Sequence, residues 1–133
     1  MSHVEDLIDF DQARRKARWA LPGPLRSLGE AIRNTRPGGE TYIGLRTIEV
    51  KRIVGSESRR REFNRGFLPR RDFLMPRWSR INEAFRHDVA LPPIQVFELN
   101  GWYYVRDGNH RVSVARFHGV EFIDAEVVRI TAA

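Results

Sequence analysis

The part of this chain best suited to chemistry is a run of seven residues, 105–111, with the sequence VRDGNHR. The residues before it predict a strand over 102–106, and those after it predict a helix over 110–118. The turn between them places a helix N-terminus, with its unpaired N–H groups and positive dipole end, beside an arginine. Such donors bind phosphate. The candidate phosphate-binding and cofactor-binding residues are Gly108, Asn109, His110 and Arg111.

Two side chains of this turn are candidates for catalysis. Asp107 can hold a Mg²⁺ ion that bridges phosphates, so it is both a candidate catalytic residue and a candidate metal ligand. His110 can protonate a leaving group or form a hydrogen bond with a phosphate oxygen. A second interpretation needs no function: Asp107 or Asn109 caps the helix, and Gly108 supplies an unusual backbone angle. The residues leave both interpretations open, although we expect Arg111 to be the main phosphate-binding side chain.

The order of elements around the turn predicts an α/β (α+β) fold, in which helices flank a small mixed β-sheet. Asn100-Gly101 is a strong hairpin signal between a strand that ends at Leu99 and the strand over 102–106. The other predicted elements of this region are a strand over 45–54, a helix over 76–88 and a strand over 122–130.

Residues 1–40 are predicted to form an N-terminal helical arm, followed by a domain over residues 41–133. The arm is expected to contain a helix to about Trp19 and a second short helix over 25–34. Residues 35–39 are typical of a loop. Two interpretations of the arm stay open, because it can pack on its own domain or pair with a second copy in a homodimer.

Several motifs follow one another in a recognisable order. They are the strand at 47–54, the Pro-Ile strand at 91–96, the turn at 108–111 and the strand at 122–127. Over residues 45–129 the chain resembles the ParB/sulfiredoxin-like superfamily, in which the turn binds phosphate. The resemblance implies a nucleotide-binding domain that takes a nucleoside triphosphate or diphosphate with Mg²⁺, and hydrolysis or phosphoryl transfer as its activity.

The chain also departs from this family. Sulfiredoxins need a cysteine at the turn, and the sequence contains none, which excludes their activity. Partitioning ParB proteins have Gly-Glu-Arg-Arg where this chain has Gly108-Asn109-His110-Arg111, so recognition of a partition site does not carry over. The Asp-Gly-x-His-Arg pattern is similar to the branch with a nucleotide-dependent free-serine kinase. That similarity supports phosphate binding more than any one substrate.

The charge of the chain supports an alternative function. The formal net charge is +6, and Lys16 and Lys51 are the only lysines among 23 basic residues. Ten of the arginines lie between residues 52 and 86, where they can hold the phosphates of a nucleotide or of a DNA backbone. The alternative is therefore a non-specific DNA-binding or regulatory module that uses the arginine-rich segment 52–86.

Composition sets the remaining limits. A chain of 133 residues has room for one modest core, and no stretch approaches the ~18 consecutive apolar residues that span a bilayer. We therefore expect a cytoplasmic protein with no membrane partner. The four histidines lack the spacing of metal ligands, so no dedicated transition-metal site is expected.

Overall fold

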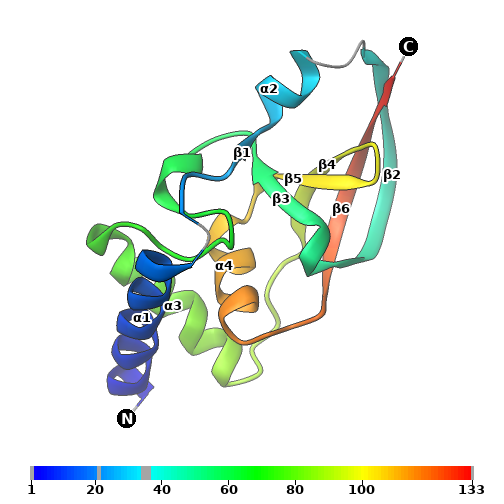
Figure 1. Ribbon diagram of the computed structural model, residues 1–133. Coiled ribbons are helices and arrows are strands. Elements are labelled where there is room, and N and C mark those ends of the chain that lie inside the picture. The colour runs from blue at the N-terminus through cyan, green and yellow to red at the C-terminus, as the bar shows by residue number, and fades with distance from the viewer. Residues whose placement is uncertain (1, 21, 34–36, 133) are drawn as a thin grey trace.

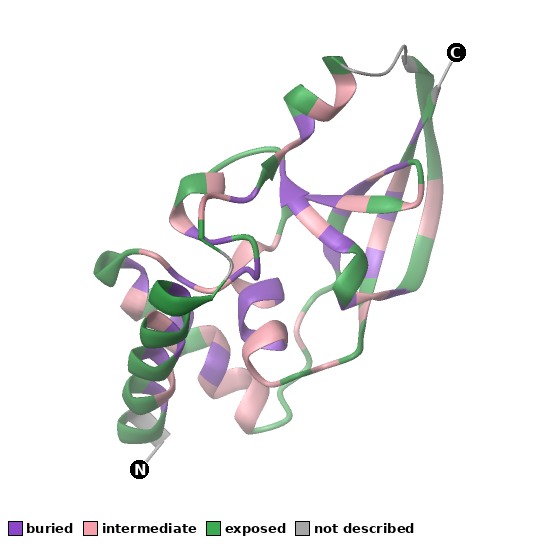
Figure 2. Ribbon diagram, viewed as in Figure 1, coloured by how far each residue is buried: buried purple, intermediate pink, exposed green. Residues whose placement is uncertain are grey.

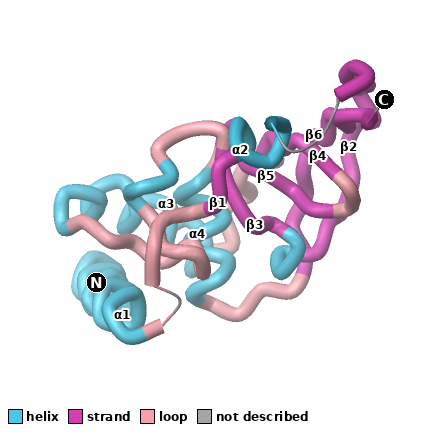
Figure 3. Tube along the Cα trace, turned by 45° about the horizontal axis from the view of Figure 1, so that its top comes forward, coloured by secondary structure: helices cyan, strands magenta, loops and turns pink. Residues whose placement is uncertain are grey.

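The computed structural model of the chain, which describes residues 2–20, 22–33 and 37–132, has the predicted α/β fold with a mixed six-stranded sheet (Figure 1). Helices α1, α3 and α4 lie together on one side of the molecule and most of the sheet lies on the other (Figure 3). The helices are α1 (Ser2–Trp19), α2 (Leu28–Arg33), α3 (Met75–Arg86) and α4 (Asn109–Phe117). The strands are β1 (Arg26–Ser27), β2 (Pro37–Glu49), β3 (Ile53–Ser56), β4 (Ile94–Leu99), β5 (Trp102–Asp107) and β6 (Phe122–Ala132).

The sheet has the strand order β1-β3-β5-β4-β6-β2. Its centre is the antiparallel hairpin of β4 and β5, and β6 lies parallel to β4 on the other side. Asn100 and Gly101 both have positive φ, 54° and 85°, as the predicted two-residue hairpin requires. The hairpin prediction is therefore confirmed, and the strand that leads to the candidate site lies in the middle of the sheet.

The core lies between the sheet and the three large helices (Figure 2). Trp78 of α3 is fully buried, packs edge-on against Phe10 of α1 and Phe117 of α4, and donates its ring N–H to Ser113 Oγ at 2.9 Å. Because one large side chain contacts both neighbouring helices, α1 and α4 are held against α3. A second cluster, with Leu28 and Phe97, lies under α2.

A buried polar network also joins α1 to α3 and α4. The side-chain amide of Asn82 donates to Asp6 Oδ1 at 2.7 Å and to Asp9 Oδ2 at 2.9 Å. Its oxygen then accepts from His118 Nε2, at 2.6 Å. The predicted N-terminal helix is thus tied to its own chain by hydrogen bonds as well as by apolar contacts.

Three predicted boundaries differ from the structure. The strand expected over 45–54 is divided, because β2 ends at Glu49 and a 3₁₀ turn, Val50–Arg52, leads into β3. The expected loop at 35–39 falls partly outside the described residues, and its part from Pro37 onward begins β2, which pairs with β6 and has register shifts between Pro37 and Gly39 and near Gly44. A short helix is expected over 25–34, but Arg26 and Ser27 form strand β1, and helix α2 begins only at Leu28. At residues 37–39, the pairing of β2 with β6 overrides the local Pro-Gly signal for a loop.

Among the described residues, no helix is both long enough and apolar enough to cross a bilayer.

Gly55 in β3 provides a test of how tightly the edge of the sheet is packed. A Cβ at this position would lie 2.3 Å from Arg26 O and 2.6 Å from Tyr104 Cδ2. We expect Gly55→Ala to lower the free energy of unfolding by about 1–3 kcal/mol in urea denaturation, because the backbone of β1 must move. Gly29→Ala in α2 is the matched control, since its nearest atom would be Ser27 Oγ at 3.5 Å, and it is expected to be neutral or stabilising. Equal effects of the two variants would contradict this packing.

Candidate functional site

The candidate site begins at the turn from β5 into α4. β5 ends at Asp107, Gly108 has a φ of +115°, and α4 begins at Asn109. A Cβ on Gly108 would lie 2.6 Å from Ile94 Cγ2, so the turn needs glycine for both its angle and its space. The first N–H groups of α4 have no partner within the helix and open beside this turn.

A small polar cavity of about 140 Å³ lies at this helix N-terminus. All five predicted site residues, 107–111, contribute to its lining. The cavity is also lined by side chains that were not among the predicted site residues. They are Arg59 and Glu62 from the loop after β3, Arg77 from α3 and Arg106 from β5. The density of arginines between 52 and 86 drew attention to this segment, but it did not indicate which of them meet at the turn.

His110 is enclosed by this cavity. Its ring lies edge-on to Phe63, with 5.2 Å between the ring centroids. Burial, together with the nearby positive charges of Arg77 and Arg59, lowers the pKa of His110 from 6.5 to about 4. The imidazole is therefore neutral at pH 7. A neutral ring has no extra proton to give to a leaving group, but it can form a hydrogen bond with a phosphate oxygen.

Several buried polar atoms of the cavity residues lack a protein partner. His110 Nδ1, Asn109 Oδ1 and Glu62 Oε1 are buried, and none of them has a hydrogen bond within the part of the chain that the structure describes. The amide nitrogen of Asn109, in contrast, donates to Ser58 O at 3.2 Å. Buried polar atoms are rarely left without partners, so their concentration here indicates a place where a polar ligand or water completes the hydrogen bonds.

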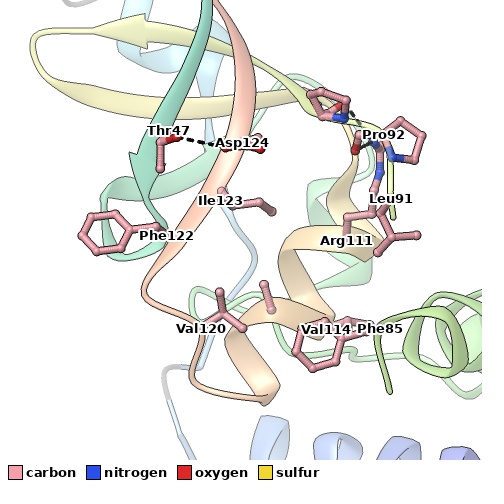
Figure 4. A pocket seen from close by; sticks show the side chains of 12 residues that line it. Thr47, Phe85, Leu91, Pro92, Arg111, Val114, Val120, Phe122, Ile123 and Asp124 are labelled. Carbon is pink, nitrogen blue, oxygen red and sulfur yellow. Dashed lines mark hydrogen bonds between the residues drawn. The ribbon is translucent and has the colours of Figure 1, made fainter. Parts of the chain in front are cut away.

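Arg111 has a different environment from the one expected. Its Nη1 donates to the carbonyl oxygens of Pro92 and Pro93 at 2.6 and 2.9 Å (Figure 4). Its Nη2 donates to Asp107 Oδ2 at 2.8 Å. The guanidinium thus connects the residues before β4 with the end of β5. Three of the five N–H groups of Arg111 already serve the protein, and the side chain also lines the polar cavity, so its role as the main phosphate-binding side chain stays a prediction.

A second cavity, of about 280 Å³, lies on the other side of Arg111 (Figure 4). Its walls are mostly apolar and include Phe85, Val114 and Ile123. At its rim, Thr47 donates a hydrogen bond to Asp124 Oδ1 at 3.0 Å. Apart from Arg111 this cavity has no basic lining residue, so its chemistry does not suit an anion.

Asp107 is the candidate metal ligand. Its side chain is 61% exposed and forms an ion pair with Arg111 through one oxygen. The described residues contain no group of three or more histidine, aspartate or glutamate side chains that could hold a metal ion by themselves. Mg²⁺ that arrives with a nucleotide needs only one or two carboxylates, because phosphate oxygens and water supply its other ligands. The residues present fit an ion of that kind.

Comparison with known proteins gives one structural match. No protein-family model matches the chain, and no curated protein matches its sequence. The crystal structure of sulfiredoxin from Arabidopsis thaliana is similar, with a TM-score of 0.47 and 20% identity over 65% of this chain and 86% of that chain. A similarity of this size says nothing about ligands, and the site stands on its own geometry.

The contacts of Arg111 predict a structural effect of its removal. We expect Arg111→Ala to lower the free energy of unfolding by about 1–3 kcal/mol in urea denaturation, because two carbonyl oxygens and Asp107 lose a charged donor. Arg46→Ala is the control, since this exposed arginine bonds to the carbonyl of its neighbour Leu45, and we expect almost no change. An Arg111→Ala variant as stable as the parent would show that these bonds contribute little.

Proposed function

We propose that this protein binds the phosphate groups of a nucleoside diphosphate or triphosphate in the polar cavity at the start of α4. The observation that carries the proposal is the convergence of Arg59 and Arg77 on the neutral, partly buried His110 at a helix N-terminus. Arginine side chains and helix N-terminal amides are two kinds of group that bind phosphate in proteins, and this cavity combines them.

The charges of the cavity favour an anion. Each carboxylate of the cavity already lies beside a guanidinium. Glu62 Oε2 is 3.8 Å from Arg59 Nη1, and Asp107 Oδ2 is 2.8 Å from Arg111 Nη2. Arg77 has no ion-pair partner among the residues that the structure describes. The protein therefore does not balance the positive charges that Arg77 and Arg106 bring to the cavity, nor the positive end of the α4 dipole.

The size of the cavity suits a phosphate group rather than a whole nucleotide. Pockets that enclose a complete small molecule are typically about 300–1,000 Å³. The polar cavity has a volume of about 140 Å³, so the phosphates lie within it and the sugar and base lie at its mouth. Base contacts in this arrangement are few, and we expect weak discrimination between bases.

Each predicted site residue has a place in the proposed function. The amides that follow Gly108 and the ring of His110 bind phosphate oxygens, and Arg111 holds the turn in shape. Asn109 Oδ1 is an acceptor, so it would accept a hydrogen bond from a ligand hydroxyl group or a water molecule. Asp107 would hold Mg²⁺, which supplies positive charge to the phosphates when it is bound. Phosphoryl transfer and hydrolysis both begin from such binding, and the proposal is for the binding step.

The arginines of segment 52–86 do not form one continuous basic surface for duplex DNA. Arg52 pairs with Glu49, Arg60 donates to Leu25 O, and Arg86 pairs with Asp6. Arg59 and Arg77 line the polar cavity, and Arg70 and Arg71 line a separate surface beside α1. This division favours the nucleotide over the DNA-binding module that the charge alone supported.

Calorimetric titration of a nucleotide panel, with and without Mg²⁺, tests the proposal. We expect di- and triphosphates and inorganic pyrophosphate to bind and nucleosides not to bind. Arg77→Ala should weaken binding by about ten- to a hundredfold, since a charge-assisted bond is lost. Arg46→Ala is the control of equal charge change on the edge strand β2, and it should leave binding unchanged. Unchanged affinity in Arg77→Ala, or equal binding of nucleosides, would overturn the proposal.

A further inference from the structure

A second concentration of arginines lies away from the polar cavity, where the C-terminal end of α1 meets the loop that leads to α3. The hollow between these two segments has a volume of about 240 Å³. Four arginines line this surface, and we call it the α1 groove. They are Arg14, Arg18, Arg70 and Arg71.

The α1 groove is a built feature, because a buried asparagine holds its two walls together. Asn64 is 1% exposed and donates its amide to Ala20 O, at the end of α1, at 3.0 Å. Its oxygen accepts from the N–H groups of Gly66 and Leu68, both at 2.9 Å. These bonds hold the backbone of the loop against the end of α1, next to the arginines that line the groove.

The charge of the α1 groove is not neutralised by the protein. Arg14 lies 2.9 Å from Asp72, so this carboxylate already has a partner. Arg18, Arg70 and Arg71 form no ion pair within the described residues. Arg65 extends the positive charge along the same rim, since its Nε lies 3.8 Å from the position that a Cβ on Gly23 would occupy.

Two exposed aromatic side chains adjoin these arginines in the chain. Trp19 follows Arg18 and is 88% exposed, and Phe73 lies two residues after Arg71 and is 61% exposed. Phe63 and Phe67 of the same loop are fully buried, so the loop does not need its remaining aromatic ring for packing. Single-stranded nucleic acids bind proteins through bases that stack on exposed aromatic rings and phosphates that contact guanidiniums, and Trp19 and Phe73 supply exposed rings next in the chain to arginines of the groove.

We propose that the α1 groove binds single-stranded nucleic acid, with the backbone along Arg18, Arg65, Arg70 and Arg71 and a base stacked on Trp19. The bases of a duplex are already stacked on one another, so a duplex gains only the phosphate contacts. The sequence of the strand matters little, because the groove offers rings and charges and no set of base-reading side chains. This surface is independent of nucleotide binding in the polar cavity.

Fluorescence anisotropy with labelled 15-nucleotide dT and rU strands tests this proposal across a series of salt concentrations. Four phosphate contacts on a single strand predict a slope of about −3 in a plot of log K against log salt. The double variant Arg18→Ala, Arg71→Ala should reduce the slope to about half. Trp19→Ala should weaken binding by about five- to a hundredfold, and Trp19→Phe should retain most of it. Stronger binding of rU than of dT would assign the site to RNA, and equal binding would assign it to either strand.

Arg33→Ala and Trp102→Ala are the matched controls, since they remove an exposed arginine of α2 and a half-exposed tryptophan of β5. We expect both to bind as the parent does, and circular dichroism to show that all the variants are folded. Three results would overturn the proposal: no binding at low salt, unchanged binding in the double variant, or tighter binding of a duplex than of a single strand. Preferential binding to vesicles of phosphatidylserine and phosphatidylcholine would also overturn it.

Discussion

The reversal of the chain at Gly108 determines the position of everything around the candidate site. Glycine can adopt the φ of +115° found here, and Ile94 leaves no room for a side chain at this position. Because residue 108 is glycine, β5 can pass directly into α4. Arg111 then reaches back from the first turn of α4 to Asp107 and to the carbonyl groups before β4. A helix N-terminus held in this way is a rigid set of N–H donors, whereas a flexible loop would have to be ordered each time that a ligand bound.

The electrostatics of the polar cavity have a cost that a ligand can relieve. Arg59 and Arg77 both act on His110, and together with burial they keep its ring neutral. Positive groups held near one another repel, and the nearest carboxylate, Glu62, is 3.8 Å from Arg59. An anion between these groups would lower the repulsion and would give His110 Nδ1 an acceptor in the tautomer that carries its proton there. Groups with strongly shifted pKa values are concentrated at functional sites for this reason.

Elements with local signals could be predicted from the sequence. Asn100-Gly101 requires two positive φ angles, and both are present in the hairpin. The stripe with Trp78 and Ile81 predicted α3, because apolar residues at helical spacing need one buried face. The turn at Gly108 followed from its position between a strand and a helix. In each case the decisive interaction lies within a few residues of the signal.

Interactions between distant residues could not be predicted. Pro92 and Pro93 precede Arg111 by 19 and 18 residues, and no local pattern shows that their carbonyl groups accept from its guanidinium. The division of 45–54 into two strands depends on pairing with β6 on one side and β5 on the other. Likewise, the sequence contains ten arginines between 52 and 86, and only the packing of α3 on α4 determines that Arg77 reaches His110.

The pKa of His110, measured by NMR with and without inorganic pyrophosphate, tests phosphate binding at this site most directly. The four histidines of the chain can be distinguished with a His110→Asn variant. Without ligand we expect a pKa of about 4, because burial and two arginines disfavour the charged ring. A bound anion favours the charged ring, so saturation with pyrophosphate should raise the pKa of His110 towards or above 6.5. A pKa that stays at its ligand-free value while pyrophosphate is bound would place the anion elsewhere and contradict the account.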